Sequence, residues 1–202
     1  MNYTIYLDMD GCCVDFVGGM AERIKQVVQE DIDTIQSPSL RRGIRKYLKV
    51  FGKSHTVTEE DLKHKAVRSL MYKLASEEGF FYNLESLQDN RLYNYITYVL
   101  DMSPVVSFEL EFLTAPIGEY AREDKTRWVR DNLGTEYTDT VNVVPRAEKV
   151  NFCTGPNCIL IDDHPDTIEQ WVEAGGIGHL YVDGDEDNFQ ALQNLLEGLG
   201  ID

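Results

Sequence analysis

The chain has 202 residues, enough for one large domain or for a core with an inserted smaller one, and 43% of them are hydrophobic. It holds 35 Asp plus Glu against 19 Lys plus Arg, and its net charge of -16 disfavours long nucleic acid as a partner. No run approaches 18 apolar residues, and the N-terminus carries no basic leader, so we expect a cytoplasmic protein with no membrane contact.

The chain opens with a short strand and continues into a long helical block. Residues 3 to 8 are β-prone and end in an acidic turn with Gly11, which indicates a strand that opens into a loop. Helical spacing, caps and breakers predict helices over 15–33, 37–51, 58–78 and 89–100. Residues 16–104 therefore form a mostly helical block.

The pattern of predicted secondary structure changes after this block, because strands and helices then alternate. The predicted strands are 108–113, 140–144, 158–161 and 179–182, and the predicted helices are 124–133, 165–174 and 186–199. Such alternation is typical of a parallel sheet with helices on its faces, an α/β fold. We expect the first strand to join this sheet, so that 1–15 and 105–202 form the core and 16–104 a helical insertion. Gly175-Gly176-Ile177-Gly178 follows a helix and indicates a helix stop.

Two acidic pairs follow strands of the predicted core. Asp8 and Asp10 flank one residue just past the first strand, and Asp162-Asp163 ends the buried run 158–161. Ligands bind at the carboxyl ends of strands in open α/β sheets, so the two pairs can meet there. Carboxylates with waters and a substrate phosphate are the ligands that Mg²⁺ prefers. We therefore expect a magnesium site.

A hydroxyl and an ammonium lie between these pairs in the chain. Thr114 ends another strand and is followed by Ala115, and Lys149 precedes the last acidic strand. A hydroxyl, a backbone N–H and an ammonium are what a phosphoryl group needs around its equatorial oxygens. The set predicts phosphoryl transfer, although Thr114 could be an ordinary strand-end hydroxyl and Lys149 a solvated surface cation.

The motif order of Asp-x-Asp-Gly, Thr, Lys and Asp-Asp resembles that of the haloacid dehalogenase-like phosphatases. Several segments resemble the 5′(3′)-deoxyribonucleotidases more narrowly: Asp8-Met9-Asp10-Gly11 with Asp15-Phe16, Gly79-Phe80-Phe81 before Asn83-Leu84, Leu113-Thr114-Ala115-Pro116, Lys125-Thr126-Arg127-Trp128-Val129 with Leu133-Gly134, and Leu160-Ile161-Asp162-Asp163. The resemblance covers most of the chain and is weakest from about 30 to 75. It implies a Rossmann-like core with a helical cap inserted after the first motif.

The resemblance also implies roles for the core residues. Asp8 would attack phosphorus and form an aspartyl phosphate, while Asp10 would protonate the leaving oxygen and later activate water. Thr114 would bind a phosphoryl oxygen, and Lys149 would neutralise charge on the nucleophile and the phosphate. Four residues are candidate Mg²⁺ ligands: Asp8, Asp10 through its carbonyl, Asp162 and, more weakly, Asp163.

In the cap, the resemblance implies a substrate pocket. Phe16 and Phe81 would line the site that stacks a base, and Lys125 matches a family lysine near the substrate phosphate, with Ala115 as a further substrate-binding residue. Each Phe could equally be cap core. The sequence departs from the family at Cys12-Cys13, where aliphatic or threonine residues are usual, and at Arg146, which is one position out of step. These departures concern the identity of the substrate.

We therefore expect a Mg²⁺-dependent hydrolase of a nucleoside monophosphate, with a deoxyribonucleotide favoured. The alternatives are a phosphatase for another small phosphomonoester such as a sugar phosphate, a polynucleotide-end phosphatase, and a catalytically idle binding module with the same fold. A signalling receiver domain also uses acidic residues, Thr and Lys around Mg²⁺, but it places its acidic pair after the first strand. A structural zinc site is disfavoured because the four cysteines do not form paired CxxC knuckles, and a homodimer is left open.

Overall fold

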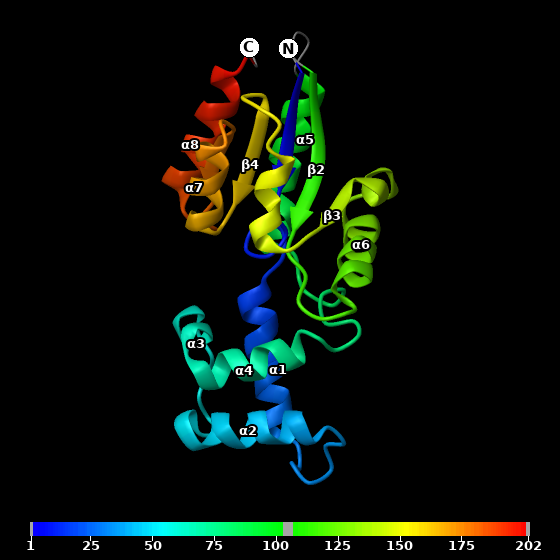
Figure 1. Cartoon of the computed structure of the whole chain (residues 1–202), viewed down its shortest axis with the longest axis vertical. Helices are drawn as coiled ribbons and strands as arrows, with labels where there is room; N and C mark the ends of the chain where they lie inside the picture. The colour runs from blue at the N-terminus through cyan, green and yellow to red at the C-terminus, as the bar shows by residue number, and fades with distance from the viewer. Residues whose placement is uncertain (1, 103–106, 201–202) are drawn as a thin grey trace. The chain divides into compact units, whose positions relative to one another are not determined.

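A computed structural model of the chain describes residues 2–102 and 107–200 (Figure 1). The chain divides into two compact units, each of which packs mainly against itself. The sheet unit comprises Met1–Asp15, Glu85–Pro116 and Thr126–Asp202, and the helical unit comprises Phe16–Leu84 and Ile117–Lys125. The helical unit thus begins one residue after Asp15, directly past the first acidic motif.

The sheet unit is built on five parallel strands in the order β3-β2-β1-β4-β5. The strands are β1 (Asn2–Leu7), β2 (Ser107–Thr114), β3 (Val141–Val143), β4 (Cys158–Asp162) and β5 (Ile177–Leu180). The parallel α/β sheet and the central place of the first strand confirm the predicted fold class. Only β5 begins as much as two residues earlier than predicted. Gly178 lies close to Ile168 and Val172, and a Cβ at this position would come within 2.9 Å of Ile168, so glycine allows the strand to pass there.

Helices and 3-10 turns connect these strands. The helices of this part of the chain are α5 (Arg91–Met102), α6 (Ala121–Asn132), α7 (Pro165–Glu173) and α8 (Glu186–Gly198), and the 3-10 turns are η1 (Leu87–Asn90), η2 (Thr135–Thr140) and η3 (Arg146–Phe152). The first five residues of α6 belong to the helical unit. Gly175 at φ +93° ends α7, as the glycine cluster predicts.

Residues 85–102 lie in the sheet unit, whereas the sequence placed them in the cap. The reason is the apolar side of α5, with Leu92 and Ile96 buried, which packs against β2. The Tyr95 ring also lies 5.4 Å from the Phe189 ring of α8, centroid to centroid. The predicted boundary at 104/105 itself lies outside the described residues.

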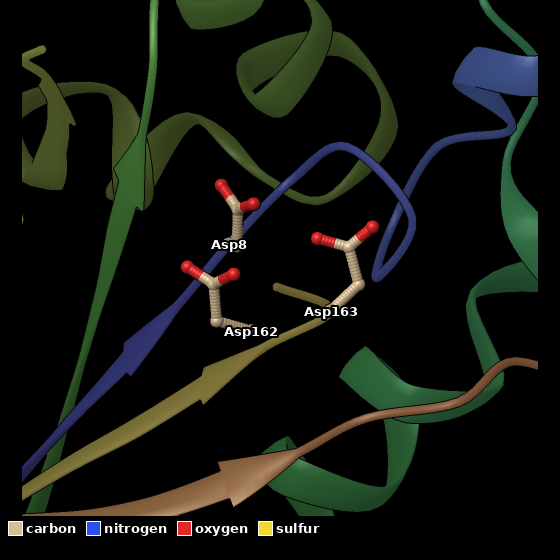
Figure 2. A group of neighbouring side chains, drawn as sticks. All are labelled: Asp8, Asp162 and Asp163. Carbon is tan, nitrogen blue, oxygen red and sulfur yellow. The ribbon is translucent and has the colours of Figure 1, made fainter. Parts of the chain in front are cut away.

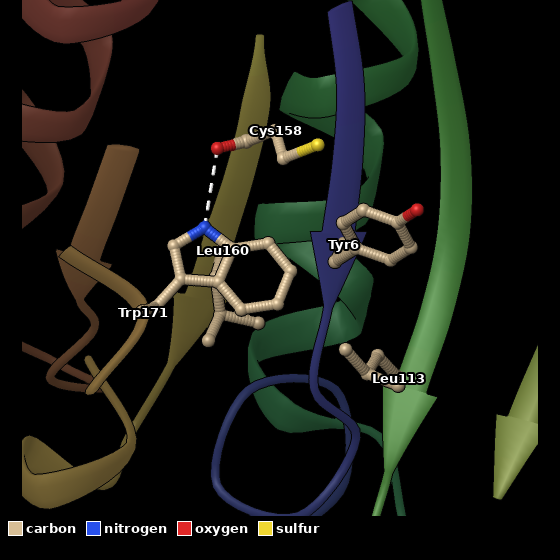
Figure 3. Close-up of a cluster of buried hydrophobic side chains, with 5 residues drawn as sticks. All are labelled: Tyr6, Leu113, Cys158, Leu160 and Trp171. Carbon is tan, nitrogen blue, oxygen red and sulfur yellow. Dashed lines mark hydrogen bonds between the residues drawn. The ribbon is translucent and has the colours of Figure 1, made fainter. Parts of the chain in front are cut away.

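One face of the sheet carries a buried cluster that η3 and α7 cover (Figure 3). Its members are Tyr6, Leu113, Cys158, Leu160 and Trp171, which come from three strands and one helix. Trp171 Nε1 donates to the carbonyl of Cys158 at 3.1 Å, so its polar atom is satisfied inside the core. This packing holds η3, and with it Lys149, against the end of the sheet.

The helical unit contains α1 (Phe16–Gln29), α2 (Pro38–Phe51), α3 (Glu59–Lys63) and α4 (Lys65–Leu74). The predicted capping pair is present, since Thr58 and Asp61 bond each other's backbone N–H groups. The predicted single helix over 58–78 is wrong, because His64 at ψ 133° is extended and separates α3 from α4. His64 then caps α4 by accepting from the N–H of Ala66.

Among the residues that the structure describes, no helix is both long enough and apolar enough to span a bilayer.

Three successive residues of η1 have left-handed backbone angles. Gln88, Asp89 and Asn90 have φ values of 42°, 51° and 61°, a region that non-glycine residues rarely occupy. Gln88 Nε2 donates to Asp183 Oδ1 at 2.8 Å. Arg91, which follows Asn90 in the chain, forms a two-pronged ion pair with Glu186. Bonds to the segment around α8 therefore hold this strained turn at both ends.

Candidate active site

The acidic pairs lie at the carboxyl ends of β1 and β4, which are neighbours in the sheet (Figure 2). Leu7 pairs with Ile161, and the N–H of Asp8 donates to the carbonyl of Ile161 at 2.9 Å, so Asp8 and Asp162 lie level. From β1 the chain continues to β2 and β3 on one side and crosses to β4 and β5 on the other. This reversal of strand order is the place where open α/β sheets bind ligands.

The loop after β1 is a tight turn centred on Met9. Its carbonyl accepts from the N–H groups of Cys12, Cys13 and Val14 at 2.8 to 3.2 Å. Gly11 has φ +78°, and a Cβ there would lie 2.4 Å from Asp163 Oδ2. Glycine is required at this position both by the backbone angle and by the approach of the second acidic pair.

Lys149 links the two acidic pairs directly. Its Nζ lies 2.9 Å from Asp8 Oδ1 and 2.7 Å from Asp162 Oδ2, and its side chain is 1% exposed. Burial alone would lower the pKa of Lys149, but the Asp8 and Asp162 carboxylates raise it above its usual range. Lys149 is thus a buried cation rather than the solvated surface lysine considered as an alternative.

The carboxyls of the second pair hold their protons more strongly than usual. Burial and the neighbouring Asp8 raise the pKa of Asp162 to about 6, although Lys149 opposes this. Desolvation, Asp8 and Asp162 likewise raise the pKa of Asp163 to about 7, even though this side chain reaches solvent. One lysine does not balance three close carboxylates, so the site favours further positive charge.

The chemistry of these donors fits a divalent cation. Asp8, Asp162 and Asp163 each offer an oxygen, and these atoms lie within 4.8 Å of one another. Three carboxylate oxygens that leave room for water and a phosphate suit Mg²⁺, which keeps part of its hydration shell. The Asp10 carboxylate is outside this group, and the carbonyl role of Asp10 stays a prediction. Within 2–102 and 107–200, no other His, Cys, Asp or Glu cluster forms such a group.

The remaining core candidates lie at the same edge of the sheet. Asp10 is in the Met9 turn and bridges to Val14, and its Oδ1 is buried. Thr114 is the last residue of β2 and fully buried, two positions after the residue that pairs with Leu7. Ala115 follows it and is partly exposed.

The cap candidates gather with one another inside the helical unit. The Phe16 and Phe81 rings stack with centroids 6.1 Å apart, and Phe80 contacts both rings edge-on. Lys125 Nζ lies 4.6 Å from the Phe81 centroid, a cation–π distance. Phe81 is 1% exposed and Lys125 is fully buried, whereas Phe16 keeps an exposed part. Base stacking on Phe81 stays a prediction.

Two contributions to the site were not predicted from the sequence. The N–H of His164 donates to Asp162 Oδ1 at 2.8 Å, an Asx-type turn just before Pro165, the first residue of α7. The sequence signal for this turn was an aspartate three residues before the proline that starts the helix. The Cys13 thiol donates to the carbonyl of Asp8 at 3.4 Å, and no sequence pattern pointed to that contact. All four cysteines are free thiols.

The comparisons with known proteins concern solved structures. No family model matches the chain, and no curated protein matches it. A HAD-superfamily hydrolase from Ehrlichia chaffeensis is similar over 98% of both chains, at 14% identity and a TM-score of 0.51. A hydrolase from Streptococcus pneumoniae TIGR4 covers 96% of this chain and 100% of its own, at 12% identity and a TM-score of 0.49. The HAD-hydrolase YfnB from Bacillus subtilis, solved bound to magnesium, covers 88% of this chain and 85% of its own, at 13% identity and a TM-score of 0.49.

At such low identity the likeness to the Ehrlichia chaffeensis structure concerns the fold alone. The strand order, the acidic pairs at the switch point and this similarity over nearly the whole length agree. The chain has the haloacid dehalogenase-like α/β fold.

Proposed function

We propose that the protein is a phosphatase that hydrolyses a small phosphomonoester, most specifically a nucleoside monophosphate, with Asp8 as the nucleophile. The observation that carries the proposal is the buried contact of Lys149 with Asp8 and Asp162 at the switch point of the sheet. The contact sets a buried positive charge beside the Asp8 carboxylate, the group that would attack phosphorus.

In the proposed reaction, one Asp8 oxygen forms a bond to phosphorus while the bond from phosphorus to the leaving oxygen breaks. Asp10 gives its proton to that oxygen, and the alcohol departs. Asp10 then accepts a proton from water as the water oxygen attacks phosphorus, and the bond to Asp8 breaks to release phosphate. Lys149 and the Thr114 hydroxyl would hold the phosphoryl oxygens. Mg²⁺ held by Asp8, Asp162 and Asp163 would supply positive charge to the phosphate.

The nucleoside part of the proposal rests on the aromatic group of the helical unit and on the resemblance of the segments around Phe81 and Lys125. Phe16 keeps an exposed part on which a base could stack, worth about 1 to 3 kcal/mol per base. A panel of deoxy and ribo 5′ and 3′ monophosphates against sugar phosphates tests this with released phosphate as the readout. A preference for sugar phosphates would overturn the nucleotide assignment and leave the phosphatase intact.

The Asp8→Asn variant tests the nucleophile. We expect it to lose at least about 10³-fold in turnover, since an amide cannot form the acyl phosphate, while circular dichroism shows the fold retained. Asp187→Asn, which removes one exposed charge from α8, is the matched control and should keep its activity. Magnesium-dependent phosphatase activity surviving in Asp8→Asn would refute the assignment. Beryllofluoride that fails to bind at Asp8 of the wild type would favour the idle binding module.

A further inference from the structure

The charge of the protein is divided unevenly between its two units. The sheet unit holds 5 Lys plus Arg and 23 Asp plus Glu, a net charge of -18, whereas the helical unit holds 14 and 12, a net charge of +2. The expectation that polyanions are repelled rests on the net charge of the whole chain, -16. Exposed charges are screened beyond about 8 Å at physiological ionic strength, so the surface of the helical unit decides locally what it binds.

Helix α2 and its flanks concentrate the cations of this unit. Between Thr34 and Thr58 the chain has no Asp or Glu but six cations: Arg41, Arg42, Arg45, Lys46, Lys49 and Lys53. The apolar side of α2 is buried through residues such as Ile44. Arg42, Lys46 and Lys49 are exposed and are spaced i, i+4 and i+7, which places them on one side of the helix. We call these three residues the α2 cationic stripe.

The stripe makes no ion pair with any residue in 2–102 or 107–200. Some exposed cations elsewhere pair with a neighbouring acid, as in Lys25 with Glu22 at 3.0 Å and Lys63 with Glu60 at 2.9 Å, whereas others, such as Lys65 and Arg68, form no ion pair with a described residue. The chain has nearly twice as many acids as bases, yet none of the acids in the described part of the chain pairs with the stripe.

Helix stability does not explain the stripe. The first turn of α2 has no acidic residue, and Arg42 lies in the half of the helix nearer its positive end, where a cation is unfavourable. Arg42 and Lys46 are like charges four residues apart, which destabilises a helix by about 0.2 to 0.5 kcal/mol. Only Lys49, in the last turn, complements the helix dipole.

We propose that the α2 cationic stripe binds the phosphodiester backbone of a nucleic acid strand. From Arg42 to Lys49 the stripe covers about 10 Å of helix axis at 1.5 Å per residue. Measured along the axis of a duplex, that length corresponds to about three phosphates of one strand at about 3.4 Å each. A linear row of cations matches a linear row of phosphates, and contacts with phosphates alone do not read base sequence. The proposal does not involve Asp8 or the phosphatase reaction.

Fluorescence anisotropy with a labelled 20-nucleotide single strand, and separately with its duplex, tests this binding in the full-length protein. We expect affinity to fall as salt rises, with a log-log slope of about -2 to -3 for three phosphate contacts. The triple variant Arg42→Ala, Lys46→Ala, Lys49→Ala should lose most of this slope and at least tenfold in affinity at 50 mM salt. The control triple Lys25→Ala, Lys63→Ala, Arg130→Ala removes the same charge from cations that are paired. It should bind like the wild type.

Three results would overturn the proposal: no salt-dependent binding of either nucleic acid by the wild type, an equal loss in the two triple variants, or self-association that depends on the stripe in a protein that binds no nucleic acid. Analytical ultracentrifugation measures the self-association and would then assign the stripe to a second copy of the chain. Binding should be unchanged in Asp8→Asn, so failure here and failure of the phosphatase proposal are distinguishable.

Discussion

Lys149 is buried, charged and in contact with two carboxylates, and each of these facts depends on the others. Moving an ammonium out of water is unfavourable by several kcal/mol unless nearby anions compensate. Asp8 and Asp162 supply that compensation at 2.9 and 2.7 Å, and in return Lys149 opposes the rise that burial causes in the pKa of Asp162. The proposed nucleophile and its cation therefore form one electrostatic unit, in which removal of Lys149 would leave two neighbouring buried carboxylates without their cation.

Replacing Lys149 with methionine should lower the free energy of unfolding by about 3 to 5 kcal/mol, because Asp8 and Asp162 would then repel each other inside the protein. Urea unfolding measures the loss. Lys63→Met, which removes an exposed lysine paired with Glu60, should change stability by less than about 0.5 kcal/mol. If the free energy of unfolding falls as little in Lys149→Met as in this control, Lys149, Asp8 and Asp162 are not coupled.

At the scale of single elements, the left-handed turn at 88–90 is the clearest departure from relaxed backbone geometry. Asp89 is exposed and has φ 51°, so Asp89→Gly should be more stable than Asp89→Ala by about 1 kcal/mol. The order should reverse at Asn194, an exposed position inside α8, where alanine favours the helix over glycine by about 1 kcal/mol. Thermal unfolding of the four variants checks both differences. The same order at both positions would contradict a left-handed residue 89.

The elements of the sheet could be predicted because each has a local cause in the sequence. Cys158-Ile159-Leu160-Ile161 is apolar throughout, as a strand buried on both faces must be, and the structure extends it by one residue to Asp162. The break at His64 could not be predicted, since no Gly or Pro marks it and it depends on how α3 and α4 pack. The same holds for α5, whose helical pattern was visible but whose packing partner was not.

The core of the candidate site followed from chain order, whereas its supporting contacts did not. The order of Asp8, Lys149 and Asp162 anticipated the group that the ion pairs bring together. The burial of Phe81 and Lys125 depends on how distant segments of the helical unit pack, which no local pattern reveals. The hydrogen bond from the His164 N–H is a backbone contact, and side-chain identity predicts such contacts poorly.

At the scale of the whole molecule, the second acidic pair links stability to pH. Asp162 and Asp163 have pKa values raised to about 6 and about 7, above the 3.8 of an unperturbed carboxyl. Between about pH 4 and 7 the folded protein therefore binds more protons than the unfolded chain, so these groups make stability fall as pH rises. Without magnesium, we expect the melting temperature to fall across this window.

Magnesium should counter that loss, because the cation binds the ionised carboxylates and so stabilises the folded protein. We expect 5 mM Mg²⁺ to raise the melting temperature more at pH 8 than at pH 5, as measured by calorimetry with EDTA as the metal-free reference. Asp163→Asn should flatten the metal-free pH dependence and reduce the effect of magnesium. A magnesium effect of equal size at both pH values would contradict this linkage.

The central position of β1 has a consequence for how the protein is made. Its partners begin at Ser107 and Cys158, so β1 is synthesised well before the two strands that pair with it. Closing such long loops is slow, and until then both backbone edges of β1 lack their partner strands. Asp8, the proposed nucleophile, is thus translated well before Lys149 and Asp162, with which it forms one ion-paired group. A chain cut short before Asp162 would carry Asp8 but no site in which it could act.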